Sequence, residues 1–448
     1  MKAASQLAIL GDRRFAPFFV TQLCTVFNDH FFKSSLTALI TFGIAGLSSA
    51  QIGRYNAWAQ LIFVVPMILA ASLSGQLAER MEKAGLMRLV KLFEIAVMLL
   101  GAAGFYLKSL PMLMTALALL GLHGIFSSTI KFSMVPQLLE SGTLVSGNAL
   151  LEGSTPFLML LGSIFGTVLA GSSRAGVIIM VIAVLGYLVS RLILPVPITS
   201  PGLKLDWNPF AESLRNLRYV SADRIVVICM LAIGWYWFFG TSVMIQLPVY
   251  TKQIIGGNKL VVVLYLFAFA AGTALGTLLC GRWSHQRVEL GMLPLAATGM
   301  TLVGVELYLA APVQALSENL DGHLMGVGAV LHTLSGARVL IDFGLLGFFS
   351  GIFIVPLYSF VQSKTAASHR SRVIAVTSMF SSVGGFLSSV YCLTLQKNGF
   401  TMPQLLLLLA AMNLALSLLV YAIAPEFVAR FLAWARGKSG AEERPLTF

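Results

Sequence analysis

Long apolar runs separated by short polar connections follow one another along almost the whole chain. A membrane-spanning helix needs about 20 apolar residues, and each run is long enough to form one. The spacing of runs and connections accommodates about twelve spans in 448 residues. The runs cover approximately residues 15–46, 52–78, 87–107, 110–135, 146–170, 175–197, 224–250, 259–281, 290–312, 339–362, 372–396 and 402–434.

The composition supports a membrane protein. Hydrophobic residues make up 57% of the chain and charged residues only 11%, against roughly 25% charged residues in a soluble domain. A soluble protein of this size could not hide so much apolar surface, whereas lipid can cover it. The net charge of +12 falls mostly in the connections, so we expect a lipid bilayer and no nucleic acid as partner. We therefore predict an all-α membrane protein.

The basic residues predict the orientation of these spans. Both termini and the even-numbered connections hold Lys2, Arg13, Arg14, Arg80, Lys83, Arg88, Lys204, Arg215, Arg218, Arg282, Arg287, Lys364, Arg370, Arg372, Arg436, Lys438 and Arg444. The odd-numbered connections hold only Arg54, Lys108, Arg174, Lys252, Lys259, Arg338 and Lys397. By the positive-inside rule, we expect an even number of spans with both termini in the cytoplasm.

A polar connector at residues 198–223 divides the chain into two sets of six spans, residues 1–197 and 224–448. The halves are weakly similar, because the fourth run ends in Val135-Pro136 and the tenth in Val355-Pro356. Two parallel six-helix halves are the arrangement of major facilitator transporters, whose substrate site lies between the halves near the midplane. We therefore expect the major facilitator fold.

Two connectors are longer than the others, residues 198–223 and residues 313–338. Within the first, Asn208 to Tyr219 has apolar residues at helical spacing with Arg215 and Arg218 beside them. This pattern suits a helix that lies in the membrane interface. A plain solvated linker helix fits it equally well.

A loop motif follows the second run, with Gly75, Glu79 and Arg80 in the sequence Gly-Gln-Leu-Ala-Glu-Arg. It resembles the loop motif between spans two and three of the major facilitator superfamily. A small residue such as Gly75 lets two helices approach closely, and Glu79 can form ion pairs that hold one state of a transporter. The alternative is a positively charged loop with incidental acidic residues.

The first run holds the most informative polar residues, Gln22, Asn28, Asp29, His30 and Lys33. At 1.5 Å per residue, Asp29 lies about 20 Å along a helix that begins near residue 15, close to the bilayer midplane. Asp29 and Lys33 are four residues apart and share a helix face, so they can pair. Ionisable residues at this depth normally face a cavity or a partner. They form either a substrate or coupling site or a self-satisfied salt bridge that orders the bundle.

The fourth and fifth runs supply Lys131, Asn148 and Glu152 near the predicted cytoplasmic ends of their helices. These residues are candidates for the inner part of the same path. Alternatively, Lys131 extends to the interface and Glu152 is favoured by the helix dipole.

Other features limit the chemistry of the chain. Glu306 lies deep in the ninth run without an identified basic partner, and it could carry a proton. The four cysteines have no metal-like spacing, and no Walker-type phosphate loop is present. The chain also lacks the His-x4-Asp signature of acyltransferases. We therefore expect no enzymatic activity, no cofactor and no metal site.

Three segments resemble bacterial lysophospholipid transporters of the major facilitator superfamily. The segment from Asn28 to Lys33 resembles their Asn-Asp-Asn-x-x-Lys segment, with His30 in place of the second Asn. Residues 131–139 resemble their Lys-Tyr-x-x-Leu-Pro-x-x-Leu segment, and residues 147–155 their Gly-Asn-x-x-x-Glu-x-x-Thr segment. The second half looks like the transporter portion of proteins that fuse this domain to a phospholipid acyltransferase.

The resemblance implies a function for the chain. It implies a transporter of the bacterial inner membrane that moves lysophospholipids, chiefly lysophosphatidylethanolamine, from the outer to the inner leaflet. Lys33 or Lys131 would meet the phosphate, and Asp29 or Glu152 the ammonium. No acyltransferase domain follows residue 435, so we expect any reacylation partner to be a separate cytoplasmic acyltransferase.

Two other functions fit the same pattern of spans. One is proton-coupled export of a drug-like or siderophore-like metabolite, with Asp29 or Glu306 as the protonatable carboxylate, because fold does not fix function. The other is a membrane subunit that only docks an acyltransferase. Docking needs no charge at the midplane, so Asp29 and Lys33 argue against it as the sole role.

Overall fold

The computed structural model describes residues 6–40, 49–140, 142–170, 172–284, 287–311 and 324–436. Several residues of the sequence analysis lie outside these ranges. They are Lys2, Lys438 and Arg444, residues 41–46 of the first run and residues 313–323 of the second long connector. The side chain of Arg54 is likewise not described.

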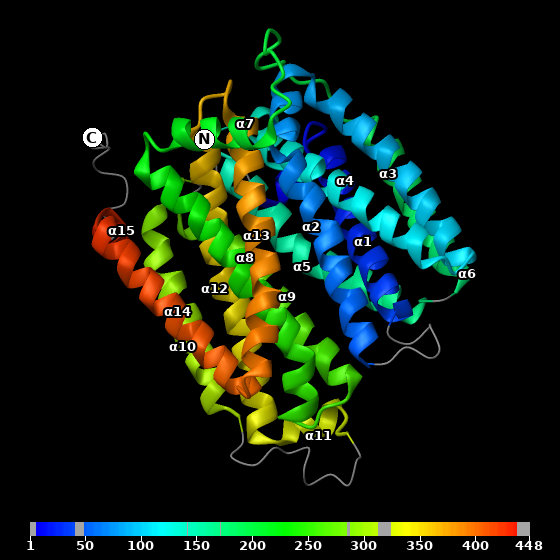
Figure 1. Ribbon diagram of the computed structural model, residues 1–448. Coiled ribbons are helices and arrows are strands. Elements are labelled where there is room, and N and C mark those ends of the chain that lie inside the picture. Colours follow the sequence, from blue (N-terminus) through cyan, green and yellow to red (C-terminus); the bar gives the residue numbers. More distant parts are fainter. Residues whose placement is uncertain are drawn as a thin grey trace.

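Helices account for nearly all of the described chain (Figure 1). The first group consists of α1 (Ala16–Ala38), α2 (Ser49–Arg80), α3 (Lys83–Tyr106), α4 (Leu110–Leu138), α5 (Leu144–Val168) and α6 (Ser173–Ser190). A separate helix, α7 (Pro209–Val220), follows. The second group consists of α8 (Arg224–Gln253), α9 (Lys259–Trp283), α10 (Leu293–Leu309), α11 (Val327–His332), α12 (Leu334–Lys364), α13 (Arg370–Lys397) and α14 (Met402–Ile423). The last helix is α15 (Glu426–Ala435), and short 3-10 turns cover Gln6–Gly11 and Leu290–Met292.

Nine helices of the described chain are long and apolar enough to cross a membrane. The remaining long helices of the first group fall outside this set for different reasons. α6 is short, at 18 residues. α1 and α3 have 23 and 24 residues, which is spanning length, but they carry buried polar and charged side chains. Both helices contribute buried polar or charged side chains to the site described below.

Three predicted boundaries were wrong. The last run, residues 402–434, is broken because Pro425 disfavours helical backbone at the residue before it; Ala424 has φ −130° and ψ 75°, and a new helix starts at Glu426. The sixth run ends at Ser190, before two prolines. The connector predicted to reach residue 338 ends at Thr333, whose hydroxyl caps α12 by accepting a hydrogen bond from the Gly336 backbone N–H.

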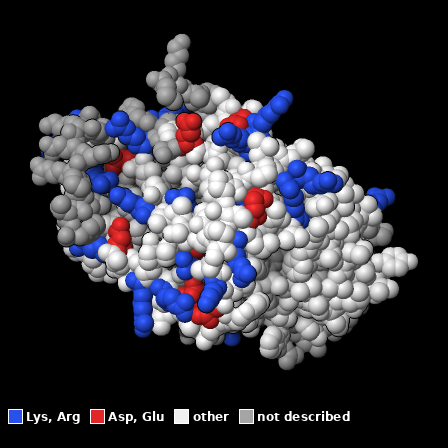
Figure 2. All heavy atoms as spheres, turned by 90° about the horizontal axis from the view of Figure 1, so that it is seen from above, with Lys and Arg blue, Asp and Glu red and all other residues white. Residues whose placement is uncertain are grey.

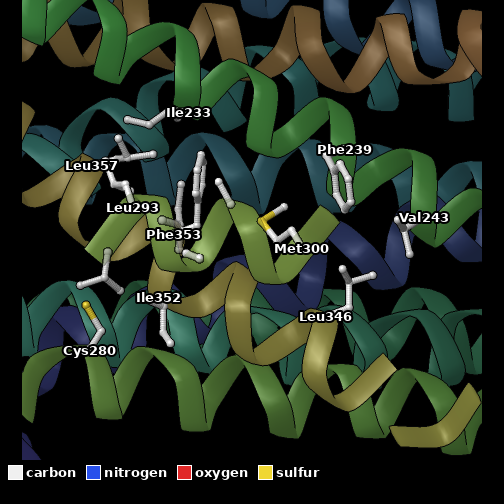
Figure 3. Packing of buried hydrophobic residues seen from close by; sticks show 14 of the residues in the cluster. Ile233, Phe239, Val243, Cys280, Leu293, Met300, Leu346, Ile352, Phe353 and Leu357 are labelled. Carbon is white, nitrogen blue, oxygen red and sulfur yellow. The ribbon is translucent and has the colours of Figure 1, made fainter. Parts of the chain in front are cut away.

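The hydrophobic core differs between the two groups. One continuous cluster joins α8, α9, α10 and α12 of the second group and extends to Phe132, Val145 and Ala149 of the first group. Figure 3 shows Met300 and Phe353 among the side chains of this cluster. In the first group, the other buried apolar residues form separate clusters. The apolar packing of the first group is thus interrupted.

The helix α7 lies across one end of the molecule and α11 at the opposite end (Figure 1). We call these the α7 end and the α11 end. α7 packs against α2, α8 and α13 and so connects the two groups. Figure 2 looks onto the α7 end and shows many Lys and Arg side chains there, with a few Asp and Glu among them.

Glycines let α9 and α12 approach closely. Gly272 and Gly276 on α9 face α12, and Gly347 and Gly351 on α12 face α9, so each helix presents small residues four positions apart. A Cβ added to Gly347 would overlap the carbonyl oxygen of Phe269. This spacing of small residues is typical of close helix contacts in membranes.

We expect Gly347→Ala to destabilise the protein by roughly 1–3 kcal/mol, because the added methyl group must push α9 away. The matched control is Gly344→Ala on the same helix, whose Cβ would lie 3.9 Å from the Ala268 carbonyl oxygen, an ordinary contact. Thermal unfolding in detergent should show a melting temperature several degrees lower for Gly347→Ala alone. Equal melting temperatures for the two variants would contradict this packing.

Candidate functional site

A layer of polar side chains divides the core of the first helix group. On one side an apolar cluster includes Phe18 and Val90, and on the other a cluster includes Phe31 and Val97. Between them lie side chains of α1, α3 and α4, which we call the polar layer. The polar layer consists of Thr25, Asn28, Asp29, Lys91, Glu94 and His123.

The carboxylate of Glu94 is at the centre of the polar layer. It accepts hydrogen bonds from Lys91 Nζ at 2.6 Å and from Asn28 Nδ2 at 3.0 Å, and His123 Nε2 lies 3.2 Å away. Lys91 Nζ also donates to Thr25 Oγ1 at 2.7 Å. Because Glu94 and Lys91 are completely buried, they depend on these partners to offset the loss of hydration.

Asp29 and Lys33 do not form the predicted pair. Among the ion pairs of the described residues, Asp29 approaches only His123, with 3.8 Å between Oδ1 and Nδ1. Lys33 Nζ instead lies 3.5 Å from the ring centroid of Phe63, a cation–π contact. Asp29 Oδ1 is buried and has no hydrogen-bond partner. The alternative of a self-satisfied salt bridge is therefore wrong, and both charges are available to a third group.

Gln22 lies two turns before Asp29, toward the α7 end. Its side chain is 3% exposed, and its Nε2 atom has no hydrogen-bond partner. A buried amide without a partner is costly, so Gln22 adds an unused donor on the same helix.

Lys131 and Glu152 form an ion pair of their own between α4 and α5. Lys131 Nζ lies 2.9 Å from Glu152 Oε1, and the two side chains are 10% and 4% exposed. Lys131 also lies over the Phe132 ring, at 4.6 Å from its centroid. Lys131 thus does not extend to the interface as the alternative for this residue required, but stays buried beside its partner.

Asn148 joins the two helix groups. Its Nδ2 atom donates to Ser359 Oγ at 3.0 Å and to Gln362 Oε1 at 2.7 Å, both on α12. Next to it, the rings of Phe132 and Tyr358 stack with centroids 3.9 Å apart. The structure thus places Lys131, Asn148 and Glu152 together where the groups meet, nearer the α7 end than Asp29.

The loop motif makes a second connection between the groups. Arg372 on α13 donates from Nε to Glu79 Oε2 at 2.7 Å and from its backbone N–H to Glu79 Oε1 at 3.2 Å. A Cβ added to Gly75 would lie 2.7 Å from Arg372 Cα, so only glycine permits this approach. Arg80 is exposed and takes part in none of the ion pairs found among the described residues. The contact therefore depends on Gly75 and Glu79.

The helix α7 strengthens this connection, which we call the latch (Gly75, Glu79, Glu212 and Arg372). Glu212 on α7 is buried and accepts from Arg372 Nη1 at 3.5 Å. At the other end of α7, Tyr219 stacks on the His369 ring with centroids 4.1 Å apart. Burial and the neighbouring Arg372 lower the pKa of His369. α7 thus packs against the helical bundle and is not a plain solvated linker.

The chain before α7 is bound to α2 as well. The backbone N–H of Ser200 donates to the Glu79 carbonyl oxygen at 2.9 Å. The Gln76 side chain exchanges two hydrogen bonds with the Asp206 backbone, at 3.0 and 2.7 Å. Hydrogen bonds from the Asn208 backbone N–H and the Arg215 side chain lower the pKa of Asp206. The connector is therefore part of the closed α7 end.

Sequence reasoning missed several members of the site. Lys91 and His123 were not proposed, although Lys91 and Glu94 stand three residues apart in an apolar run, a spacing that indicates a shared helix face. Glu212 gave no signal, because its partner is distant in sequence. Glu306 was expected to lack a basic partner, but Arg338 donates to it from Nε at 2.9 Å. The described residues contain no group of three or more His, Cys, Asp and Glu that could hold a metal ion.

A helical bundle of spanning length with ionisable side chains buried far from both ends defines an integral membrane transport protein. The chain belongs to the Major Facilitator Superfamily, whose family model matches residues 18–389.

Comparisons with individual proteins agree with the family. The chain is 28% identical over 321 residues to the lysophospholipid transporter LplT of Enterobacter sp. (strain 638), covering 69% of this chain and 72% of that protein. It is 26% identical over 377 residues to the lysophospholipid transporter LplT of Photorhabdus laumondii, covering 81% and 83%.

Solved structures show the same fold. The human organic anion transporter MFSD10 superposes with a TM-score of 0.69 at 15% identity, covering 90% of this chain and 97% of that one. The transporter FucP in its outward conformation gives a TM-score of 0.65 at 15% identity, covering 94% and 98%.

We expect Glu79→Gln to open the α7 end, because it removes the charge of the nearer of the two carboxylates that pair with the Arg372 guanidinium and leaves only the longer contact with Glu212. Spin labels at the exposed positions Glu140 on the first group and Lys364 on the second would report the distance between the groups. Glu79→Gln should shift the distance distribution to longer values. Arg80→Gln is the matched control and should leave it unchanged; identical distributions for both variants would contradict the latch.

Proposed function

We propose that this protein is a secondary transporter that moves lysophospholipids, chiefly lysophosphatidylethanolamine, from the outer to the inner leaflet of the bacterial inner membrane. The observation that carries the proposal is the pair of unmatched charges on α1. Asp29 and Lys33 lie one turn apart within the bilayer-spanning part of the chain, and each lacks a partner of opposite charge in hydrogen-bond contact. The names of the similar proteins point to the same substrate class.

The chemistry of the headgroup matches these two charges. Lysophosphatidylethanolamine carries a phosphate and an ammonium group, so Lys33 would bind the phosphate and Asp29 the ammonium. Charge-assisted hydrogen bonds in a site shielded from water are the strong ones. The single acyl chain needs only an apolar surface, which lipid or the exposed helix faces supply.

The second charged group continues the path. Lys131 and Glu152 offer another cation and anion between the polar layer and the α7 end. In the proposed path, the headgroup moves from Asp29 and Lys33 to Lys131 and Glu152 and then leaves toward the inner leaflet. Asn148 would have to release Gln362 for this step, because their hydrogen bonds join the two groups at this level.

Alternating access supplies the motion. We assign the α7 end to the cytoplasm because basic residues gather in its connections, so both termini are cytoplasmic. Residues 1–197 and 224–448 would rock as two bodies about the substrate, with residues 198–223 as the connector. The latch and the contacts of Asn148 keep the described arrangement closed on the cytoplasmic side. A separate cytoplasmic acyltransferase would consume the product.

The competing proposal of proton-coupled metabolite export is weaker on one observation. Glu306, one of its two candidate carboxylates, is bound by Arg338, and a salt-bridged carboxylate is a poor proton carrier. Asp29 remains, and it belongs to the lysophospholipid site proposed above. A purely docking role leaves the buried charges of α1 without a use.

We expect Asp29→Asn and Lys33→Gln each to reduce lysophosphatidylethanolamine flipping at least about tenfold, since each removes a charged hydrogen bond of roughly 1.5–3 kcal/mol. The assay uses the purified chain in liposomes, with extraction of outer-leaflet lysolipid by albumin. Lys252→Gln, which alters an exposed lysine at the end of α8, is the matched control.

The headgroup selectivity of the Asp29→Asn variant distinguishes a defect in headgroup binding from a defect in folding. Lysophosphatidylglycerol has no ammonium group, so Asp29→Asn should reduce its transport much less than that of lysophosphatidylethanolamine. If both variants flip both lysolipids at the wild-type rate, the assignment of Asp29 and Lys33 to the headgroup site is wrong. If the wild-type chain flips neither, the proposed substrate class is wrong.

A further inference from the structure

The imidazole of His123 lies between two carboxylates. Nδ1 is 3.8 Å from Asp29 Oδ1 on α1, and Nε2 is 3.2 Å from Glu94 Oε2 on α3. His123 is completely buried, and neither ring nitrogen has a well-directed hydrogen bond in the structure. A histidine with a carboxylate at each nitrogen needs an explanation, because one proton cannot serve both contacts.

The chemistry of imidazole makes this arrangement a proton site. A neutral ring has one N–H donor and one nitrogen lone pair. Either tautomer would therefore direct a lone pair at a carboxylate oxygen, which is repulsive. A second proton turns both contacts into charge-assisted hydrogen bonds. The geometry thus favours an imidazolium between Asp29 and Glu94.

The surrounding groups show where the proton can enter and leave. The charged groups that approach His123 are Asp29 on α1 and Glu94 on α3. Lys91 pairs with Glu94, and Lys33 acts on Asp29. α2 packs against this part of α4 through uncharged side chains. A cavity of about 210 Å³ also reaches His123, but its other lining residues are all apolar: Leu86, Leu89, Val90, Phe93, Leu122 and Phe126. Asp29, whose side chain is 15% exposed, is therefore the polar route to the ring.

Lys33 Nζ lies over the Phe63 ring and not against Asp29, so His123 is the basic group that approaches Asp29 among the described residues. Lys91 and Glu94 cancel each other in direct contact. An imidazolium at His123 offsets the negative charge of Asp29 at short range, whereas Lys33 acts on that charge without contacting it. An ammonium group bound at Asp29 would supply the same positive charge. An uncompensated charge in a buried site is strongly destabilising. The proton on His123 and the ammonium group of the substrate therefore compete for the position beside Asp29.

We propose that His123 is a proton-binding site whose proton is exchanged for the ammonium group of the substrate at Asp29. When the headgroup binds, the proton on Nδ1 leaves to water past Asp29, and the ring keeps its N–H toward Glu94. One proton is released for each ammonium bound, and the charge of the layer is unchanged. This inference rests on the proposed function, because it places an amine-bearing headgroup at Asp29.

The test counts protons released on binding. Calorimetric titrations of the purified protein are run in two buffers of different ionisation enthalpy, from about pH 5.5 to about pH 7.5, the range in which histidine commonly titrates. Lysophosphatidylethanolamine should release close to one proton per molecule bound at the acidic end. Lysophosphatidylglycerol, which lacks the ammonium group, should release none.

Variants locate the proton. In His123→Gln, the number of protons released per molecule of lysophosphatidylethanolamine bound should fall to zero. His332→Gln, which alters an exposed histidine at the end of α11, is the matched control and should release as many protons as the wild type. Equal release from His123→Gln and the wild type, or no release from the wild type while it binds, would overturn the inference.

A second measurement tests the proton site without substrate. Spectra of protein labelled with 15N-histidine distinguish a doubly protonated ring from a neutral one. Without lysolipid, the wild type should give an imidazolium signal that disappears in His123→Gln and becomes a neutral-tautomer signal in Asp29→Asn. If lysophosphatidylethanolamine does not bind but this signal is present, the proposed function fails and the proton site stands. If His123 is neutral throughout the pH range, the proton site is overturned.

Discussion

The first helix group is organised around one buried carboxylate. Glu94 takes hydrogen bonds from Lys91 on its own helix and from Asn28 on α1, and it faces His123 on α4. The helix α6 also packs closely against Lys91, because a Cβ added to Gly186 would lie 2.9 Å from Lys91 Nζ. A charge so deep in the protein is tolerated only with such partners. Their positions fix how these helices pack and hold the adjacent Asp29 in place.

The two helix groups differ in how their cores are built. The second group has a continuous apolar core, closely packed through the glycines of α9 and α12. The first group interrupts its core with the polar layer, which in the proposed function supplies charges that bind a lipid headgroup. The groups meet through Asn148 with Gln362 and through Glu79 with Arg372. Apolar contacts lie beside these polar ones, as in the stacked rings of Phe132 and Tyr358.

The sequence predicted most of the fold because hydrophobic runs locate spanning helices directly, and the run predicted for residues 110–135 became α4 with only small changes at its ends. It failed where one residue changed the local backbone, as Pro425 did between α14 and α15. The pattern of hydrophobic residues does not reveal such a break inside an apolar stretch.

The site was less predictable because its contacts are distant in sequence. The i,i+4 rule suggested that Asp29 pairs with Lys33, but Phe63 on α2 and His123 on α4 compete for those side chains in the folded bundle. Glu79 and Arg372 are 293 residues apart, so no local pattern could join them. The apolar runs singled out Asp29 but not Lys91 or Glu212, and only the tertiary packing determined the partners of these charges.

In the proposed function, the polar layer and the neighbouring Lys33 receive the headgroup of a lysophospholipid. A lysophosphatidylethanolamine analogue with a photoreactive group beside its amine, bound to the purified protein and analysed by peptide mass spectrometry, tests this assignment most directly. We predict crosslinks on α1 and α4 around Asp29 and His123 that are lost in Asp29→Asn and retained in Lys252→Gln. Crosslinks confined to the lipid-facing surface, or unchanged in Asp29→Asn, would contradict it.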